Sequence, residues 1–127
     1  MKLTKNFKRS EFECKDGTPM TENQLKNIQE LAKNLQVLRD ALDKPINITN
    51  AYRSRSHNQA IGGSKFSQHV LGKAADIYVE GYTPKELAKV IEGLIKDEKM
   101  SEGGIGIYSN NNFVHYDIRG TKARWNG

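Results

Sequence analysis

The sequence has little cysteine and no long apolar segment, and each absence narrows what the protein can be. Cys14 is the one cysteine among 127 residues, so no internal disulfide can form and no oxidising compartment is required. No stretch approaches the roughly 20 apolar residues of a membrane-spanning helix, which predicts no membrane insertion. Residues 1–17 contain no apolar run of the kind found in a signal peptide, so we expect synthesis in the cytoplasm.

The composition is that of a small folded domain with a basic surface. The length fits a single domain over residues 1–127, and a monomer is the simplest expectation. Lysine and arginine exceed aspartate and glutamate, which gives a formal net charge of +5 and favours polyanionic partners in general. The lysines are scattered and do not alternate with aromatic residues. We therefore expect no nucleic-acid partner.

Two helices are predicted from apolar spacing and capping signals. The first begins after Thr21, where Gln24 completes a capping box, and Pro45 is expected to end it. Its apolar stripe consists of Leu25, Ile28, Leu31, Ala32, Leu35, Leu38 and Leu42. The second begins at Thr83-Pro84, with proline at the first helical position, and ends before Gly103.

Short segments of alternating polarity predict strands around these helices. They lie near residues 45–49, 76–79, 105–107 and 113–118. The polar, glycine-bearing stretch 54–72 is predicted to be a functional loop. The order helix, strand, loop, strand, helix, strand, strand predicts an α+β fold with a small antiparallel sheet flanked by helices.

Two of the three histidines stand in informative surroundings. His69 precedes Asp76 in the segment SQHVLGKAAD, and period-two alternation turns Asp76 away from the apolar Ile77 and Val79. A carboxylate in such a place needs a partner or a cation. The alternatives for Asp76 are a helix cap or a salt bridge to a lysine.

The third histidine, His115, lies in a predicted strand. Phe113, His115 and Asp117 share one face of that strand, with His115 and Asp117 about 7 Å apart along it. Such a pair suits a metal and its water, or else a cross-strand polar contact on a solvated face. Two histidines and one carboxylate are a sufficient zinc set, with the fourth position left to water.

Three separated segments together resemble the M15 zinc D-Ala-D-Ala carboxypeptidase family, whose fold is shared with the zinc domain of hedgehog signalling proteins. The segments are AYRS (51–54), SQHVLGKAAD (67–76) and FVHYD (113–117). The pattern SxHxxGxAxD is matched at each fixed position by Ser67, His69, Gly72, Ala74 and Asp76. The resemblance extends from about Phe7 to Trp125 and implies a hedgehog/DD-peptidase-like fold.

The resemblance implies roles for individual residues. His69, Asp76 and His115 would bind Zn²⁺. Arg53 would point into the site and hold a substrate carboxylate or a developing oxyanion. Ser67 would position the substrate or the ligand loop, or serve only as a hydrogen-bonding residue of that loop.

One position departs from the family pattern. Several members carry a catalytic Asp or Glu three residues before the last histidine ligand, where this chain has Asn112. Asp117 is the best substitute as the catalytic base, unless it orients His115 instead. His57 could form a three-histidine site in principle, but the family pattern assigns the third ligand to Asp76, so we expect His57 in a loop at the cleft rim, as a candidate substrate contact.

Together with the candidate ligands, the resemblance implies a zinc metallopeptidase that hydrolyses peptidoglycan peptide bonds involving D-amino acids, as a D,D-carboxypeptidase or an endopeptidase. Its basic surface and lack of a signal peptide suit a phage-lysin-like enzyme that reaches the bacterial wall after release. The alternative is a non-catalytic, zinc-stabilised module that binds the wall or a protein. A basic nucleic-acid-binding domain is a further rival, with steeply salt-dependent binding as its signature.

Overall fold

Helices and strands alternate along the chain in the computed structural model, which describes residues 1–64 and 66–127. The α-helices are α1 (Glu22–Leu42), α2 (Arg55–Ala60) and α3 (Pro84–Lys96), with short 3₁₀ turns η1 (Arg9–Phe12) and η2 (Ser109–Asn111). The strands are β1 (Asn47–Asn50), β2 (Ala74–Tyr78), β3 (Gly104–Tyr108), β4 (Phe113–Asp117) and β5 (Ala123–Asn126). This architecture confirms the predicted α+β class.

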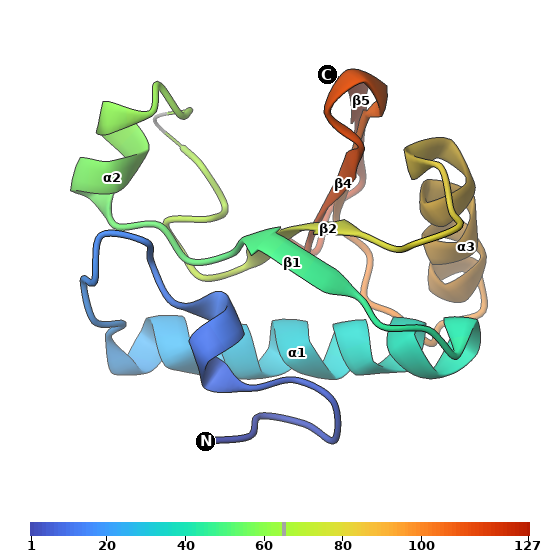
Figure 1. Cartoon of the computed structure of the whole chain (residues 1–127), viewed down its shortest axis with the longest axis horizontal. Coiled ribbons are helices and arrows are strands. Elements are labelled where there is room, and N and C mark those ends of the chain that lie inside the picture. Colours follow the sequence, from blue (N-terminus) through green and yellow to red (C-terminus); the bar gives the residue numbers. More distant parts are fainter. Residues whose placement is uncertain (65) are drawn as a thin grey trace.

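The strands form one sheet in the order β1-β2-β4-β3-β5. Neighbouring strands are antiparallel, except that β5 pairs parallel to β3 at the edge. Figure 1 shows α1 along one side of the sheet, and α3 lies near the C-terminal end of α1.

Local signals account for both long helices. Thr21 caps α1 by accepting a hydrogen bond from the backbone N–H of Gln24 at 3.2 Å, and the Gln24 side chain accepts from the N–H of Thr21 at 2.8 Å. The helix ends before Pro45, because Asp43 adopts a left-handed conformation at the C-cap. Thr83 and Glu86 form the same box at the start of α3. None of the described helices is long and apolar enough to cross a bilayer.

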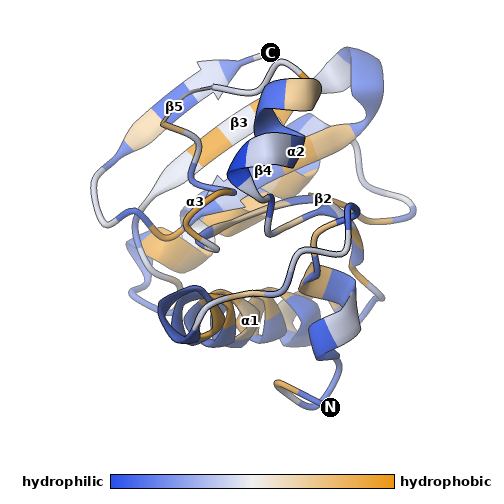
Figure 2. Cartoon of the chain, turned by 90° about the vertical axis from the view of Figure 1, so that its left-hand side faces the viewer, coloured by the Kyte–Doolittle hydropathy of each residue, from blue (hydrophilic) through white to orange (hydrophobic). Residues whose placement is uncertain are grey.

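The hydrophobic core lies between α1, α3 and one face of the sheet. Ile28, Leu31 and Leu35 of α1 are fully buried, as are Ile77 and Val114 of the sheet. In Figure 2, where α1 is seen nearly end-on, the sheet lies above it. Alternation along each strand therefore leaves the opposite face of the sheet for other side chains.

Two elements differ from the sequence prediction. The predicted loop 54–72 is wrong over Arg55–Ala60, which form α2, because the Ser54 side chain caps this helix by accepting from the N–H of His57 at 3.1 Å. The strand β5 was not expected, because it depends on parallel pairing with β3, from which it is separated in the chain by β4.

Candidate metal centre

Strand register brings two of the predicted ligands together. Asp76 of β2 pairs with His115 of β4, so both side chains project from the sheet face opposite the core. His69 comes from the turns before β2. That segment bends back at Gly72, which has φ +75° and lies so close to Gln24 that an added Cβ would be 2.8 Å from its carbonyl oxygen. Glycine is therefore required at this position of the motif.

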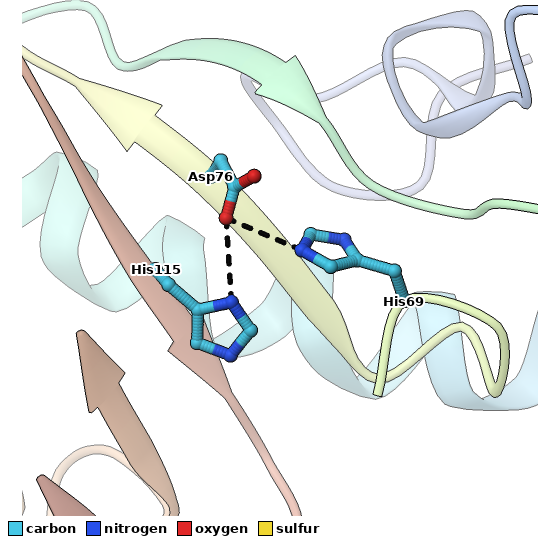
Figure 3. Close-up of side chains that lie close together, drawn as sticks. All are labelled: His69, Asp76 and His115. Atoms are coloured by element: carbon cyan, nitrogen blue, oxygen red, sulfur yellow. Dashed lines mark ion pairs between the residues drawn. The ribbon is translucent and has the colours of Figure 1, made fainter. Parts of the chain in front are cut away.

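The three side chains converge on one point, as Figure 3 shows. Asp76 Oδ1 lies 3.2 Å from His69 Nε2 and 3.3 Å from His115 Nδ1. One ligand atom from each residue lies within 4.8 Å of the others, and all three residues are buried. Imidazole nitrogens and a carboxylate oxygen are ligands that zinc prefers.

In both histidines, the ring nitrogen that points away from Asp76 lies against a hydrogen-bond acceptor. His69 Nδ1 lies 2.7 Å from the carbonyl oxygen of Ala51, and His115 Nε2 lies 2.7 Å from Asp117 Oδ2. Because both partners accept hydrogen bonds, these nitrogens carry the protons in the neutral imidazoles. The lone pairs of His69 Nε2 and His115 Nδ1 are thereby directed toward Asp76, as a metal ligand requires.

The state of Asp76 tests whether a cation fits. Its Oδ1 is buried and has no hydrogen-bond partner among the described residues. Burial opposes ionisation of this carboxyl, but in the metal-free protein the imidazoles of His115 and His69, which donate hydrogen bonds and carry positive charge when protonated, outweigh it and hold the pKa of Asp76 well below its usual range. A buried carboxylate oxygen that lies between two imidazole nitrogens and has no geometrically formed hydrogen bond with a described residue fits a divalent cation.

The histidine His115 has the opposite shift. Burial lowers its pKa, but the carboxylates of Asp117 and Asp76 outweigh burial and raise the pKa of His115 above its ordinary value. A proton therefore competes with a cation for this ligand.

The three residues lie in a cleft of about 580 Å³. Arg53 and Ser67 also line it, where the sequence predicted substrate contacts. The Ser67 hydroxyl accepts a hydrogen bond from the backbone N–H of His69 at 3.2 Å, which fixes the start of the ligand segment. Ser67 is thus placed for either of the roles considered for it.

The guanidinium of Arg53 lies beside the candidate ligand Asp76. Its Nη2 is 3.7 Å from Asp76 Oδ2, and its Nη1 donates to the Asn58 side chain at 3.3 Å. Three buried side-chain polar atoms lack a hydrogen-bond partner in the described part of the chain, and all belong to residues that line this cleft: Arg53 Nε, Gln68 Oε1 and Asp76 Oδ1. These atoms are available to a water, an ion or a ligand in the cleft.

Asp117 lies behind His115 and has no exposed surface. Its Oδ1 accepts from the backbone N–H groups of Gly104 and Arg119 and from Arg119 Nε, while Arg119 Nη2 contacts Oδ2 at 2.7 Å. Burial opposes ionisation, but the contacts from His115, Arg119 and Gly104 outweigh it and hold the pKa of Asp117 well below its usual range. Both oxygens are therefore engaged within the protein.

Two other predicted positions lie away from the cleft. His57 is on α2 and lines a separate cavity with Glu11, Glu13 and Tyr52, so the structure does not bring it to the metal ligands. Asn112 is an exposed turn residue in the left-handed conformation, φ 54°, which asparagine tolerates. It lines a different surface pocket beside the start of α3.

Several cleft residues were missed by the sequence analysis. Gln68, Tyr108, Phe113, Arg119 and Trp125 all line the cleft. The proximity of Gln68 to His69 and of Arg119 to Asp117 in the sequence was a usable signal. Tyr108 and Trp125 gave none, because they reach the site through strand pairing.

Comparison with known proteins identifies the class. The sequence profile described as Peptidase M15 matches residues 5–117, and the chain belongs to this family. This finding agrees with the resemblance seen in the sequence motifs.

Particular relatives can be named within the class. The chain is similar to the peptidoglycan L,D-endopeptidase MepK of Escherichia coli K12, with 32% identity over 65% of this chain and 44% of the relative. It is also similar to a probable peptidoglycan L,D-endopeptidase MepK of Haemophilus influenzae, with 31% identity over 74% of this chain and 50% of the relative. The chain thus spans about half the length of these relatives or less. Among solved structures, it matches the L-Ala D-Glu endopeptidase ChiX of Serratia marcescens with TM-score 0.42 and 16% identity, over 61% of this chain and 71% of that chain.

Proposed function

We propose that this protein is a zinc-dependent metallopeptidase that hydrolyses peptide bonds of peptidoglycan involving D-amino acids. The observation that carries the proposal is the buried cluster of His69, Asp76 and His115, whose free ligand atoms converge at the cleft. Membership of the M15 family supports peptide hydrolysis, and the relatives named as peptidoglycan endopeptidases support the bacterial wall as the substrate.

The three clustered residues would hold the ion, and the cleft leaves room for substrate and water. Zinc, when bound, supplies a Lewis acid that polarises a carbonyl and lowers the pKa of a coordinated water to about 7. Ala51 and Asp117 hold the two imidazoles in the tautomers that such binding requires.

Arg53 is placed to bind the substrate beside the ligands. Its Nε lacks a partner in the described chain, and its guanidinium is next to Asp76. We propose that it donates hydrogen bonds to a substrate carboxylate or to the oxyanion that develops during hydrolysis.

We propose that Asp117 orients His115 and is not the catalytic base. Both of its oxygens already accept hydrogen bonds, and it is fully buried behind the ligand. A general base must come within hydrogen-bond reach of the proton that it removes. The contacts of Asp117 therefore favour the second of the two roles considered for it.

Of the two peptidase modes, we propose endopeptidase action. The relatives that are 31% and 32% identical to this chain over the aligned segments are named L,D-endopeptidases, which cleave within a peptide. Release of a single terminal D-alanine would instead indicate a D,D-carboxypeptidase.

One observation favours the alternative of a non-catalytic, zinc-stabilised binding module. Apart from Asp76, no carboxylate of a described residue lines the cleft, so none is placed there to move a proton. Such a module would bind zinc and peptidoglycan without cleaving it.

The deciding experiment is digestion of purified peptidoglycan with zinc-loaded protein, chelated protein and a His69→Ala variant in parallel. New amino groups in the zinc-loaded sample alone would support the peptidase, and the fragment masses would identify the bond. Stoichiometric zinc binding with no new amino groups would refute peptidase activity on this substrate and favour the binding module.

A further inference from the structure

A tryptophan at the edge of the sheet contacts the metal centre from a segment that the family match does not reach. Trp125 lies on β5, beyond residues 5–117. It is the single tryptophan of the chain, and it lines the same cleft as His69 and Asp76.

Strand pairing explains how an edge residue reaches the centre. Asp76 pairs with His115, His115 with Gly106, and Gly106 with Trp125, so these four residues form a row across β2, β4, β3 and β5. Residues paired across neighbouring strands project from the same face. Trp125 is therefore separated from His115 only by Gly106.

The lack of a side chain at Gly106 permits contact across that position. A Cβ added to Gly106 would lie 2.5 Å from both Cε2 and Nε1 of Trp125, so the indole lies over this glycine. The ring centroids of Trp125 and His115 are 5.0 Å apart with the planes tilted by 52°, which is contact distance for two aromatic rings.

The indole is held in place by two further contacts. Its Nε1–H donates to the Tyr108 hydroxyl at 2.9 Å, and the Arg119 guanidinium carbon lies 5.5 Å from the indole centroid. Arg119 binds Asp117 through two nitrogens, and Asp117 binds His115. Trp125, His115, Asp117 and Arg119 thus form a closed ring of contacts.

We propose that Trp125 is a positioning residue that fixes the imidazole of His115 directly and, through Arg119, the carboxylate that orients it. The inference rests on the proposed zinc-dependent function. It assigns to β5 a part in metal binding, with Gly106 providing the space for it. Residues that orient a ligand typically change metal affinity or activity by about 10–100-fold when they are replaced.

The first test compares zinc affinity, by chelator competition, and the kcat and KM for peptidoglycan in four variants. We expect Trp125→Ala to weaken zinc binding about tenfold and to lower kcat by about 10–100-fold, with little change in KM. Trp125→Phe keeps an aromatic ring against His115 and should retain most of the zinc affinity and most of the kcat. Gly106→Ala should resemble Trp125→Ala although the indole is retained. Gly93→Ala is the matched control, since no atom lies within 4 Å of the added Cβ.

Two outcomes would overturn the positioning role. Unchanged zinc affinity and kcat in Trp125→Ala would leave Trp125 with a structural role at most. A raised KM with zinc affinity and kcat retained would make it a substrate contact. If wild-type protein neither bound zinc nor cleaved peptidoglycan, the proposed function would fail. If wild type did both, unchanged Trp125 variants would refute the positioning role alone.

A second test needs no Trp125 variant that might fail to fold. Because the chain has one tryptophan, its emission reports on Trp125 alone. Titration with Co²⁺, a quenching ion that can replace zinc at such sites, should reduce the emission until one equivalent is bound. His69→Ala, which leaves the Trp125–His115 contact intact, should abolish this response. Stoichiometric binding of Co²⁺ without any change in emission would refute the placement of Trp125 beside the metal.

Discussion

Replacing Asp117 with asparagine tests the role of this carboxylate with almost no change in side-chain size. In the native protein, Oδ1 and Oδ2 both face hydrogen-bond donors, including the Nε2–H of His115. An asparagine can accept with its one oxygen, so its NH₂ group must face donors on the other side. If the NH₂ faces His115, the imidazole can accept that bond only by moving its proton to Nδ1, where the cation would bind.

The expected magnitude follows from burial and charge. Asp117 is fully buried and Arg119 has 29% of its side chain exposed, so the substitution leaves an incompletely solvated cation without its partner. Removing one member of a buried ion pair costs about 3–5 kcal/mol. Because Arg119 retains some access to water, we expect about 3 kcal/mol, and the altered tautomer should weaken zinc binding by about 10–100-fold.

The assay is urea unfolding of the metal-free protein at pH 7, together with chelator competition for zinc. Asp43→Asn is the matched control, because the Asp43 side chain is fully exposed and its left-handed backbone suits asparagine. A variant that lost turnover but kept its zinc affinity and its stability within about 1 kcal/mol would refute the orienting role. That result would instead make Asp117 the catalytic base.

Three further predictions concern other parts of the site. Gly72→Ala should destabilise the protein by more than about 1 kcal/mol in urea unfolding, because φ is +75° and the new Cβ would meet the Gln24 carbonyl. The control Gly93→Ala should stabilise the protein, and equal effects of the two substitutions would contradict this account. The raised pKa of His115 stabilises the metal-free protein below about pH 6.5, because the folded protein then binds the proton more tightly than the unfolded chain does. The Tm of chelated protein should therefore fall as the pH rises through the folded pKa, and a Tm unchanged from pH 6 to 8 would contradict this prediction. Arg53→Lys should lower kcat/KM on peptidoglycan at least about tenfold while zinc affinity is retained, because the lysine ammonium cannot reproduce the planar set of N–H donors of the guanidinium. Wild-type kinetics in this variant would exclude a contact between Arg53 and the substrate.

Local sequence signals were enough to predict the long helices and most strands. The capping boxes at Thr21 and Thr83 are formed as predicted, because a cap depends only on residues three apart. The alternation in β2 and β4 correctly separated buried Ile77 and Val114 from the residues of the opposite face. The short helix α2 was missed, since six residues carry too little periodicity to be recognised.

The sequence by itself determined which residues can bind a metal. His69, Asp76 and His115 were candidates by their chemistry, the resemblance to the M15 family implied them as ligands, and the structure brings their ligand atoms together. The sequence also provides the backbone freedom that the site needs, since Gly72 permits the turn that returns His69 to the sheet.

Tertiary structure alone decided what surrounds those ligands. It separated His57 from the cleft, enclosed Asp117 behind His115, and brought Trp125 across Gly106 to the candidate metal centre. Pairing between strands that are not consecutive in the chain, β2 with β4 and β3 with β5, brings Asp76 beside His115 and Trp125 beside Gly106, and no short-range pattern encodes that pairing. The candidate ligands could therefore be predicted from the sequence, whereas the orientation of their side chains depends on the assembled sheet.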